Sequence, residues 1–325
     1  MSKNRKLFEE IGEQSNSSQR VSTESLSVED TSWLMIWLWT LLVSLISLIL
    51  VGGWTRLTDS GLSIIEWKPI TGMIPPLNAE RWVVEFEKYK SIPEFKLVNF
   101  DITMEEFKFI YWWEWGHRQL ARFIGVVWFV GFLVLWLKNK IPERWAIYFF
   151  SIGLLGALQA FLGWWMVSSG LDGQVVDVFS YRLAIHLTMA FIILALIFWS
   201  ILFHSENAVK IFESRRYRKR FSVNMLLALG FLCYVQLALG ALVAGIDAGR
   251  GYNDWPLMNG NWIPDDLFDY EPFITNFFEN PGLVQFNHRI AGYVLFGAVC
   301  LVWWNNRNSP YSKISKASNY LIIII

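Results

Sequence analysis

The chain has 325 residues, of which 54% are hydrophobic and 17% charged, and it contains 19 tryptophans. Soluble globular proteins contain about 25% charged residues, so this composition excludes an ordinary soluble domain and indicates a polytopic membrane protein. The 28 basic and 28 acidic residues cancel, and this lack of net positive charge argues against a nucleic-acid partner.

Residues 1–32 form a polar segment that mixes lysine, arginine and glutamate and contains no apolar core. Such a segment is not a secretory signal, and its acidic residues are untypical of a mitochondrial transit peptide. We therefore expect a cytoplasmic tail on a multi-pass protein of the cell inner (cytoplasmic) membrane, and favour this location over the mitochondrial inner membrane.

Six apolar runs approach the roughly 20 residues that a membrane-spanning helix requires. They cover residues 33–53, 117–137, 145–167, 183–203, 221–244 and 289–304. A seventh run begins after Lys316 and stops at Ile325, too short to cross, so we expect the chain to be truncated in its seventh span. The predicted fold class is all-α, a polytopic membrane helix bundle.

The distribution of charge predicts the orientation. Lysines and arginines cluster after the second, fourth and sixth runs, whereas residues 245–287 contain seven acidic residues and one arginine. Because basic residues mark cytoplasmic loops, the N-terminus is predicted inside and the odd-numbered spans run outward. His117, His186 and His288 then lie near the outer beginnings of the even-numbered spans. His204 follows His186 by 18 residues, roughly 27 Å along a helix, and belongs to the inner surface.

An internal repeat relates two parts of the chain. Glx-x-x-His-Arg clusters occur at residues 114–118 and 285–289, each after a loop in which the same six residues recur in the same order. The first loop has Asp59, Gly61, Trp67, Pro69, Gly72 and Pro75, and the second has Asp247, Gly249, Trp255, Pro256, Gly260 and Pro264. Gln159-x-x-x-Gly163 and Gln236-x-x-x-Gly240 form a weaker echo. Two parallel repeats explain this order. We place them at residues 33–205 and 221–325, joined by a basic inner loop at 206–220.

The three outer histidines are candidate metal ligands. Imidazole is the commonest side-chain ligand for a metal or haem iron, and two helices of a bundle can present two imidazoles at equal depth. This favours His117 and His186 as ligands of one haem iron, with His288 as their counterpart in the repeat. The alternative is that each is an interfacial histidine satisfied by water or a backbone carbonyl.

Charged residues near these histidines have two interpretations each. Glu114 is either an acid favoured by a helix N-terminus or a carboxylate beside the haem edge that stabilises a cationic intermediate or handles protons. The arginines either snorkel to the interface or clamp the haem propionates. These cofactor-binding candidates are Arg56, Arg118, Arg122, Arg182 and Arg289.

The motifs together resemble the haem A synthase family, in particular the branch that includes the mitochondrial Cox15 proteins. The first half carries GGWTRLTDSGLS at residues 52–63, EWKP at 66–69 and EWGHR at 114–118. The second half carries LVAGIDAG at 242–249, ENP at 279–281 and VQFNHR at 284–289. The resemblance covers about residues 33–304. A cysteine pair that some relatives carry in the first outer loop is missing here.

This resemblance implies an eight-span duplicated bundle with four haem-ligating histidines. It pairs His117 with His186, gives His288 a partner on an eighth span that this chain lacks, and matches Glu114 to the family's carboxylate. The implied reaction is oxidation of the C8 methyl group of haem O to a formyl group, with water as the oxygen source, giving haem A for cytochrome oxidase. Haem O is then the substrate of the first half and haem b the cofactor of the second.

The resemblance also implies membrane lipid, an electron acceptor and the haem O synthase that supplies the substrate as partners, while a homo-oligomer is left open. Two other functions compete with the enzyme. One is a bis-histidine b-type membrane cytochrome that passes electrons to or from quinol; Glu114 and the long first outer loop favour the enzyme over it. The other is a transporter without haem, built from parallel repeats.

Overall fold

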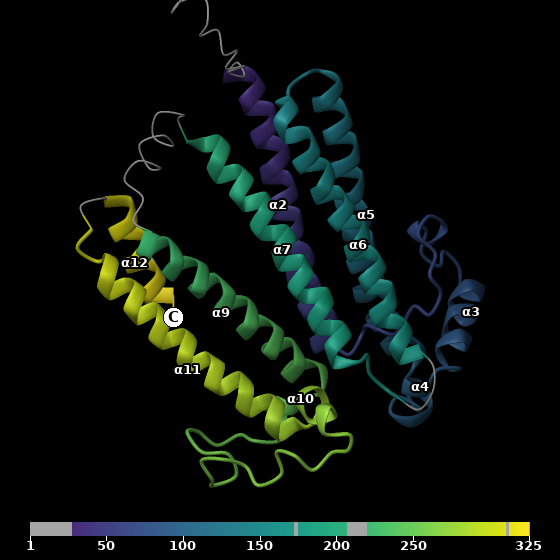
Figure 1. Cartoon of the computed structure of the whole chain (residues 1–325). Helices are drawn as coiled ribbons and strands as arrows, with labels where there is room; N and C mark the ends of the chain where they lie inside the picture. The colour runs from purple at the N-terminus through teal and green to yellow at the C-terminus, as the bar shows by residue number, and fades with distance from the viewer. Residues whose placement is uncertain (1–27, 172–174, 207–219, 310–311, 325) are drawn as a thin grey trace, which may run out of the picture.

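The computed structural model describes residues 28–171, 175–206, 220–309 and 312–324. Within these ranges the regular elements are helices (Figure 1), so the predicted all-α fold class is confirmed. The predicted tail at residues 1–32 and the basic loop at 206–220 lie almost entirely outside the described residues.

Six helices of the described residues are long and apolar enough to cross a membrane, in agreement with the predicted number of full spans. They are α2 (Val28–Leu57), α5 (Met104–Leu137), α6 (Glu143–Leu171), α7 (Ser180–Ser205), α9 (Arg220–Gly245) and α11 (Pro281–Asn306). The protein is therefore an integral membrane protein. The seventh apolar run, up to Ile324, lies in α12 (Ser312–Ile324).

Short helices occupy the two long loops between spans. The loop after α2 holds η1 (Thr71–Met73), α3 (Ala79–Tyr89) and α4 (Pro93–Leu97). The loop after α9 holds η2 (Ala248–Arg250), η3 (Phe273–Thr275) and α10 (Asn276–Glu279). Both loops lie at the lower end of the bundle in Figure 1, as equivalent loops of parallel repeats would.

The second span begins much earlier than its apolar run. Helix α5 starts at Met104, because Thr103 caps it and exchanges hydrogen bonds with Glu106 in a capping box. His117 therefore lies well inside a helix, not at its beginning. Glu114 is the eleventh residue of this helix, too far from the N-terminus for the dipole to favour it. The interpretation of Glu114 as an acid of the first helical turn is thus wrong.

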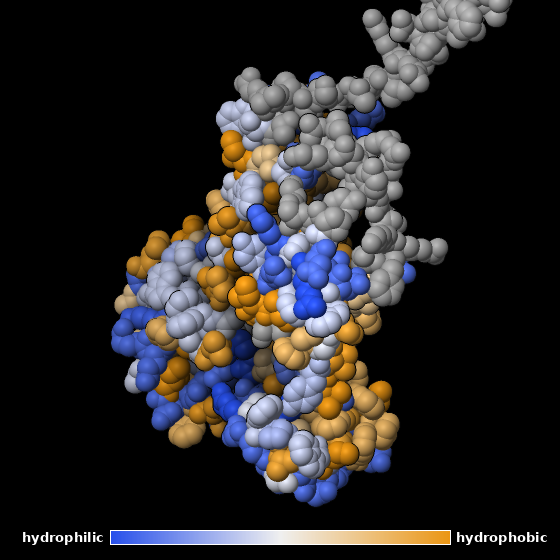
Figure 2. Space-filling model, turned by 90° about the vertical axis from the view of Figure 1, so that its left-hand side faces the viewer, coloured by the Kyte–Doolittle hydropathy of each residue, from blue (hydrophilic) through white to orange (hydrophobic). Residues whose placement is uncertain are grey.

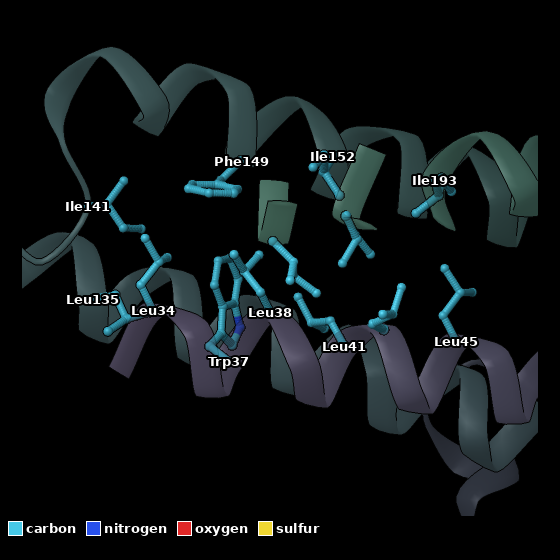
Figure 3. Close-up of a cluster of buried hydrophobic side chains, with 13 residues drawn as sticks. Leu34, Trp37, Leu38, Leu41, Leu45, Leu135, Ile141, Phe149, Ile152 and Ile193 are labelled. Atoms are coloured by element: carbon cyan, nitrogen blue, oxygen red, sulfur yellow. The ribbon is translucent and has the colours of Figure 1, made fainter. Parts of the chain in front are cut away.

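The first half packs around α2. This helix contacts α5 and α7, and α6 contacts α7 on the other side. Figure 3 shows buried leucines of α2, including Leu38 and Leu41, facing Phe149 and Ile152 of α6. Trp37 lies in the same cluster, and its indole donates to the backbone carbonyl of Val127 at 3.0 Å. This apolar cluster fixes the part of the half-bundle that lies away from the long loops.

The second half joins the first through α9, which contacts both α7 and α11. At the loop end, Ser180 of α7 donates to the backbone carbonyl of Phe278 in α10 at 2.8 Å. Figure 2 shows exposed hydrophobic patches among hydrophilic residues on the side of the molecule where α9 and α11 lie. Apolar side chains on the outside of long helices match a lipid environment.

Two equivalent positions of the repeated motifs share one backbone conformation. Asp59 and Asp247, which occupy the same place in the two repeated motifs, both adopt left-handed conformations, with φ of 47° and 50°. Few residues other than glycine adopt this conformation, although aspartate and asparagine tolerate it. The two helices α2 and α9 are therefore followed by the same kind of turn.

Candidate functional site

Each of the three outer histidines lies against a glycine of a neighbouring span. A Cβ atom placed on Gly52 of α2 would lie 2.9 Å from Cε1 of His117, and one on Gly163 of α6 would lie 2.9 Å from Cε1 of His186. The equivalent distance from Gly240 of α9 to His288 is 3.1 Å. Since real Cβ atoms rarely approach so closely, only glycine leaves room for these imidazoles in their present positions.

The residue four positions before each glycine also contacts the ring. Leu48, Gln159 and Gln236 provide backbone hydrogen bonds to the three histidines, respectively His117, His186 and His288. One turn of helix separates residues i and i+4, so carbonyl and glycine lie on one face. The same device therefore holds an imidazole in three places.

One nitrogen of each ring has no partner. The Nδ1 atoms of His117, His186 and His288 are buried and form no hydrogen bond in the described structure. A buried polar atom without a partner is costly, so these rings are suited to receive another group. An iron that takes a nitrogen lone pair would satisfy this requirement, and the three histidines thus fit a haem ligand set.

His117 and His186 lie on α5 and α7, the two helices that contact α2 in the first half. His204 lies elsewhere, as expected. Its Nδ1 is 2.8 Å from the backbone carbonyl of Ser200, and its ring packs against Trp145. Within the described ranges, no three His, Cys, Asp or Glu side chains gather to form a metal-ion site.

Glu114 is buried and holds the first outer loop against α5. Its Oε2 accepts from the Ser63 hydroxyl and from the Ile64 backbone N–H, both at 2.7 Å. Its Oε1 accepts from Arg118 at 2.5 Å. The residue lies one helical turn before His117, on the same face of α5. It therefore presents a fixed carboxylate next to the first histidine.

The equivalent residue of the second half is uncharged. Gln285 lies three residues before His288 and donates to the backbone carbonyl of Tyr252 at 3.0 Å. Its Oε1 is buried and has no partner. The two histidine sites therefore share a backbone design but differ in charge, since only the first has a carboxylate at this position.

The arginines that follow His117 and His288 hold the two long loops. Arg118 donates to the backbone carbonyls of Ile64 and Glu66 at 2.7 and 3.1 Å. Arg289 donates to the carbonyls of Tyr252, Asp254 and Leu257 at 2.8 to 3.0 Å. Because these donors are engaged with the backbone, the two residues anchor the loops over the histidines.

The other three predicted cofactor-binding arginines differ in whether a buried guanidinium nitrogen lacks a hydrogen-bond partner. Arg56 binds Asp59 and the second half of the molecule. Arg122 donates to the carbonyls of Lys68 and Pro69, and its buried Nη1 has no partner. Arg182 stacks on Trp165, with 4.4 Å between guanidinium carbon and ring centroid, and its buried Nε has no partner.

Two cavities lie at equivalent places under the outer loops. The first has a volume of about 300 Å³, and Arg118 and Arg122 line it together with Glu66, Lys68 and Arg81. The second, of about 220 Å³, is lined by Arg289 and by aromatic residues such as Trp255 and Tyr293. Both therefore lie beside the arginine that follows one of the candidate histidine ligands, but the first is lined by more charged residues.

Glu94 of α4 is a buried acid that the sequence patterns did not reveal. Its side chain accepts from Asn99 at 3.2 Å through Oε1, while Oε2 has no partner. Burial raises its pKa to about 8, and the nearby carboxylates of Asp177 and Glu114 add to the effect. Glu94 is therefore mostly protonated at neutral pH. Gly52 and Ser63 were likewise not among the predicted site residues, although both lie in the family-like stretch at residues 52–63.

Comparison with known proteins gives a consistent result. Residues 35–325 match the family COX15-CtaA, described as cytochrome oxidase assembly protein. A haem A synthase of Dinoroseobacter shibae is 48% identical over 329 residues, covering 100% of this chain and 86% of the relative. One of Paracoccus denitrificans is 49% identical over 276 residues, covering 85% of this chain and 72% of the relative. No solved structure matches the chain at a significant level.

Proposed function

The chain belongs to the COX15-CtaA family of cytochrome oxidase assembly proteins, and on this premise we propose that it is a haem A synthase. As such it is an oxidoreductase that converts haem O to haem A. It acts in the bacterial inner membrane. The basic residues that follow the second, fourth and sixth spans support an orientation with the N-terminus inside.

We propose that the first half binds the substrate haem and the second half a haem b cofactor. His117 and His186 would hold the first haem, and His288 would be a ligand of the second. The observation that supports this division is the pair Glu114 and Gln285, which differ in charge at equivalent positions three residues before a histidine. A carboxylate is useful where positive charge develops, whereas a haem that only transfers electrons does not require one.

The overall reaction defines what the first site must do. Oxidising a methyl carbon to a formyl carbon adds one oxygen atom from water and releases four electrons and four protons. The haem iron supplies a one-electron redox centre when haem is bound. An electron acceptor must collect the electrons, and the protein must stabilise positive charge at the methyl carbon before water attacks.

Glu114 is suited to this stabilising role. An ionised carboxylate offers about four lone-pair positions, and three donors occupy them here: Ser63, Ile64 and Arg118. These partners hold the carboxylate in one orientation and leave a lone pair for the substrate side or for a water molecule. A charge that is already oriented costs little reorganisation when the reaction occurs.

Arg122 and Arg182 are the best candidates for the haem propionates. Each retains a buried guanidinium nitrogen without a partner, and a propionate would satisfy that donor with a charge-assisted hydrogen bond. Arg56, Arg118 and Arg289 have their donors on backbone carbonyls and carboxylates of the protein. For these three we propose anchoring of the loops in place of the propionate contact expected from the sequence.

The test is haem extraction followed by mass analysis. The chain would be expressed in cells that make haem O but lack their own haem A synthase. Haem A should accumulate with the wild-type protein and not with His117→Ala or His186→Ala. A b-type cytochrome would instead retain haem b and leave haem O unchanged, so the absence of haem A would contradict the proposal.

A further inference from the structure

The cavities beneath the two long loops are lined by equivalent positions of the repeat. In each half, the second residue before the histidine, the first after it and the fifth after it belong to the lining. These residues are Trp115, Arg118 and Arg122 in the first half and Phe286, Arg289 and Tyr293 in the second. Helices α5 and α11 therefore present the same face to their cavities.

The chemistry of the two cavities differs. The first is lined by four basic and two acidic side chains. Among the residues that line the second, Arg289 alone is charged, and its guanidinium already donates to three backbone carbonyls of the loop. The other lining residues include Trp255, Trp262, Phe286 and Tyr293. Aromatic walls whose single charge is already engaged favour an uncharged, planar ligand.

The size and the mouth of the second cavity narrow the choice. An apolar cavity of about 150 Å³ holds a benzene molecule, so the volume of about 220 Å³ admits one substituted six-membered ring. Trp255 and Trp262 line the cavity and are exposed on the surface. Exposed tryptophans are typical of the membrane–water boundary. A ligand that is dissolved in the membrane can therefore reach the cavity.

A strip of exposed apolar side chains leads away from the cavity along α11. It begins at Ile290, which lines the cavity, and continues through Val294 to Leu301. The equivalent face of α5 is also exposed, at Phe123 and Val130, although that half-bundle contains four long helices. An apolar tail attached to the ring would lie along this face of α11, in contact with lipid.

The cavity also contains a hydrogen-bond donor. The indole nitrogen of Trp255 donates to the hydroxyl oxygen of Tyr293 at 2.9 Å. The oxygen of this hydroxyl is thus an acceptor, and within the described ranges no protein group accepts its own hydrogen. A phenol can donate and accept at the same time. Tyr293 is therefore able to donate to a carbonyl oxygen of a bound ring.

The proposed reaction requires an acceptor of both electrons and protons. Two C–H bonds of the methyl group and both O–H bonds of water break, a C=O bond forms, and four electrons and four protons are released. A quinone takes up two electrons and two protons and becomes a quinol. Two quinones therefore balance one conversion of methyl to formyl: the methyl group, one water and two quinones give the formyl group and two quinols.

We propose that the second cavity binds the ring of a membrane quinone, which is the electron acceptor of the reaction. Tyr293 donates to a ring carbonyl, and Trp255 and Phe286 pack against the ring. Phe286 and Ile290 flank His288 within one turn on α11, so the quinone lies across one helix from the second histidine site. This inference rests on the proposed function.

The first test measures quinone binding without haem. The full chain is placed in lipid nanodiscs, and equilibrium binding of decylubiquinone is measured. Tyr293→Phe removes only the hydroxyl and should weaken binding by about 2- to 10-fold, the value of one hydrogen bond. Ile290→Trp fills the cavity and should weaken binding by about 10-fold or more, because the ring loses its buried apolar surface.

The matched control is Val126→Trp. It adds the same side chain to the lipid-exposed face of α5, and Val126 lines neither cavity. Quinone binding should therefore equal that of the wild type. If Ile290→Trp does not fold, Tyr293→Phe decides, since it retains the ring and its packing.

The second test counts products under anaerobic conditions. Wild-type protein loaded with haem O and supplied with decylubiquinone should form two quinols for each haem A, and Ile290→Trp should form neither. A parallel sample of the wild type receives ferricyanide, a water-soluble one-electron acceptor. This sample shows separately whether the chain makes haem A.

Three results would overturn the inference. One is quinone binding that neither Tyr293→Phe nor Ile290→Trp weakens. Another is binding that Ile290→Trp abolishes and Tyr293→Phe leaves unchanged, which would indicate a groove for lipid chains. The third is haem A formed with ferricyanide but not with decylubiquinone, which would leave the haem A synthase proposal intact. Absence of haem A with both acceptors, together with quinone binding that both variants weaken, would support the site and contradict the proposed function.

Discussion

Arg56, at the end of α2, lies 3.3 Å from Asp247, which follows α9 in the other half of the molecule. The same guanidinium binds Asp59 at 2.7 Å and the backbone carbonyl of Ala244 at 2.8 Å. Asp59 and Asp247 are equivalent in the repeat, so one cation joins the two equivalent turns. This contact links the two halves at the ends of α2 and α9 that lead into the long loops.

Arg56→Ala should therefore weaken the contact between the halves. We expect a loss of about 1–2 kcal/mol, mainly from the hydrogen bond to Ala244, because partly exposed ion pairs contribute little. Thermal unfolding in detergent measures the effect. Arg250→Ala is the control, since that side chain is 78% exposed and lies 3.7 Å from Asp247. Equal unfolding temperatures of wild type and Arg56→Ala would contradict the linking role.

Glu114→Gln should abolish conversion of haem O while haem still binds. The change keeps size and hydrogen-bonding capacity but removes the charge, and loss of one electrostatic stabiliser typically costs roughly 10²–10³-fold in rate. Haem content per protein and haem A formed are measured together. Normal haem A output would count decisively against the role. A joint loss of haem and stability would instead assign Glu114 to the structure of the loop through Ser63.

Gly52→Ala should displace the imidazole of His117. The new Cβ would lie 2.9 Å from Cε1 of that ring, whereas a Cβ on the adjacent Gly53 would meet nothing within 4 Å. Gly53→Ala is thus a control with the same change at the next residue. We expect Gly52→Ala to weaken haem binding in the first half by about 10- to 100-fold. The haemochrome absorbance of both variants measures this, and indistinguishable values would refute the prediction.

Glu94 should make the stability depend on pH. Its pKa rises from an ordinary value of 4.5 to about 8 in the folded protein. The protonated Glu94 carboxyl therefore contributes its full stabilisation of the folded protein below about pH 4.5. This stabilisation is lost as pH rises through 8. Glu94→Gln removes the ionisable group, so the variant should gain stability relative to wild type between pH 5 and pH 9.

Unfolding temperatures of both proteins at several pH values check this prediction. Glu87→Gln is the control, because the side chain of Glu87 is 61% exposed and pairs with Lys90 on the surface of α3. A constant difference between wild type and Glu94→Gln across the pH range would show that Glu94 does not ionise in this window.

The predicted and observed spans differ most at α5. The apolar run predicts a start at residue 117, but the helix begins at Met104. Hydropathy detects only the part of a helix that lies in lipid, and residues 104–116 are mixed polar and aromatic. The capping box of Thr103 and Glu106 is a local signal that would have located the true start.

The sequence by itself determined the number of long spans, the all-helical fold and the repeated loops, because span length, hydropathy and residue order are local properties of the chain. The tertiary structure alone decided which partner each site residue has. Gly52 contacts His117, which lies 65 residues later in the sequence. Arg118 binds backbone carbonyls of loop residues that lie about 50 residues before it. Such contacts depend on how helices rotate and pack against one another, and residue type only limits the choice of partners.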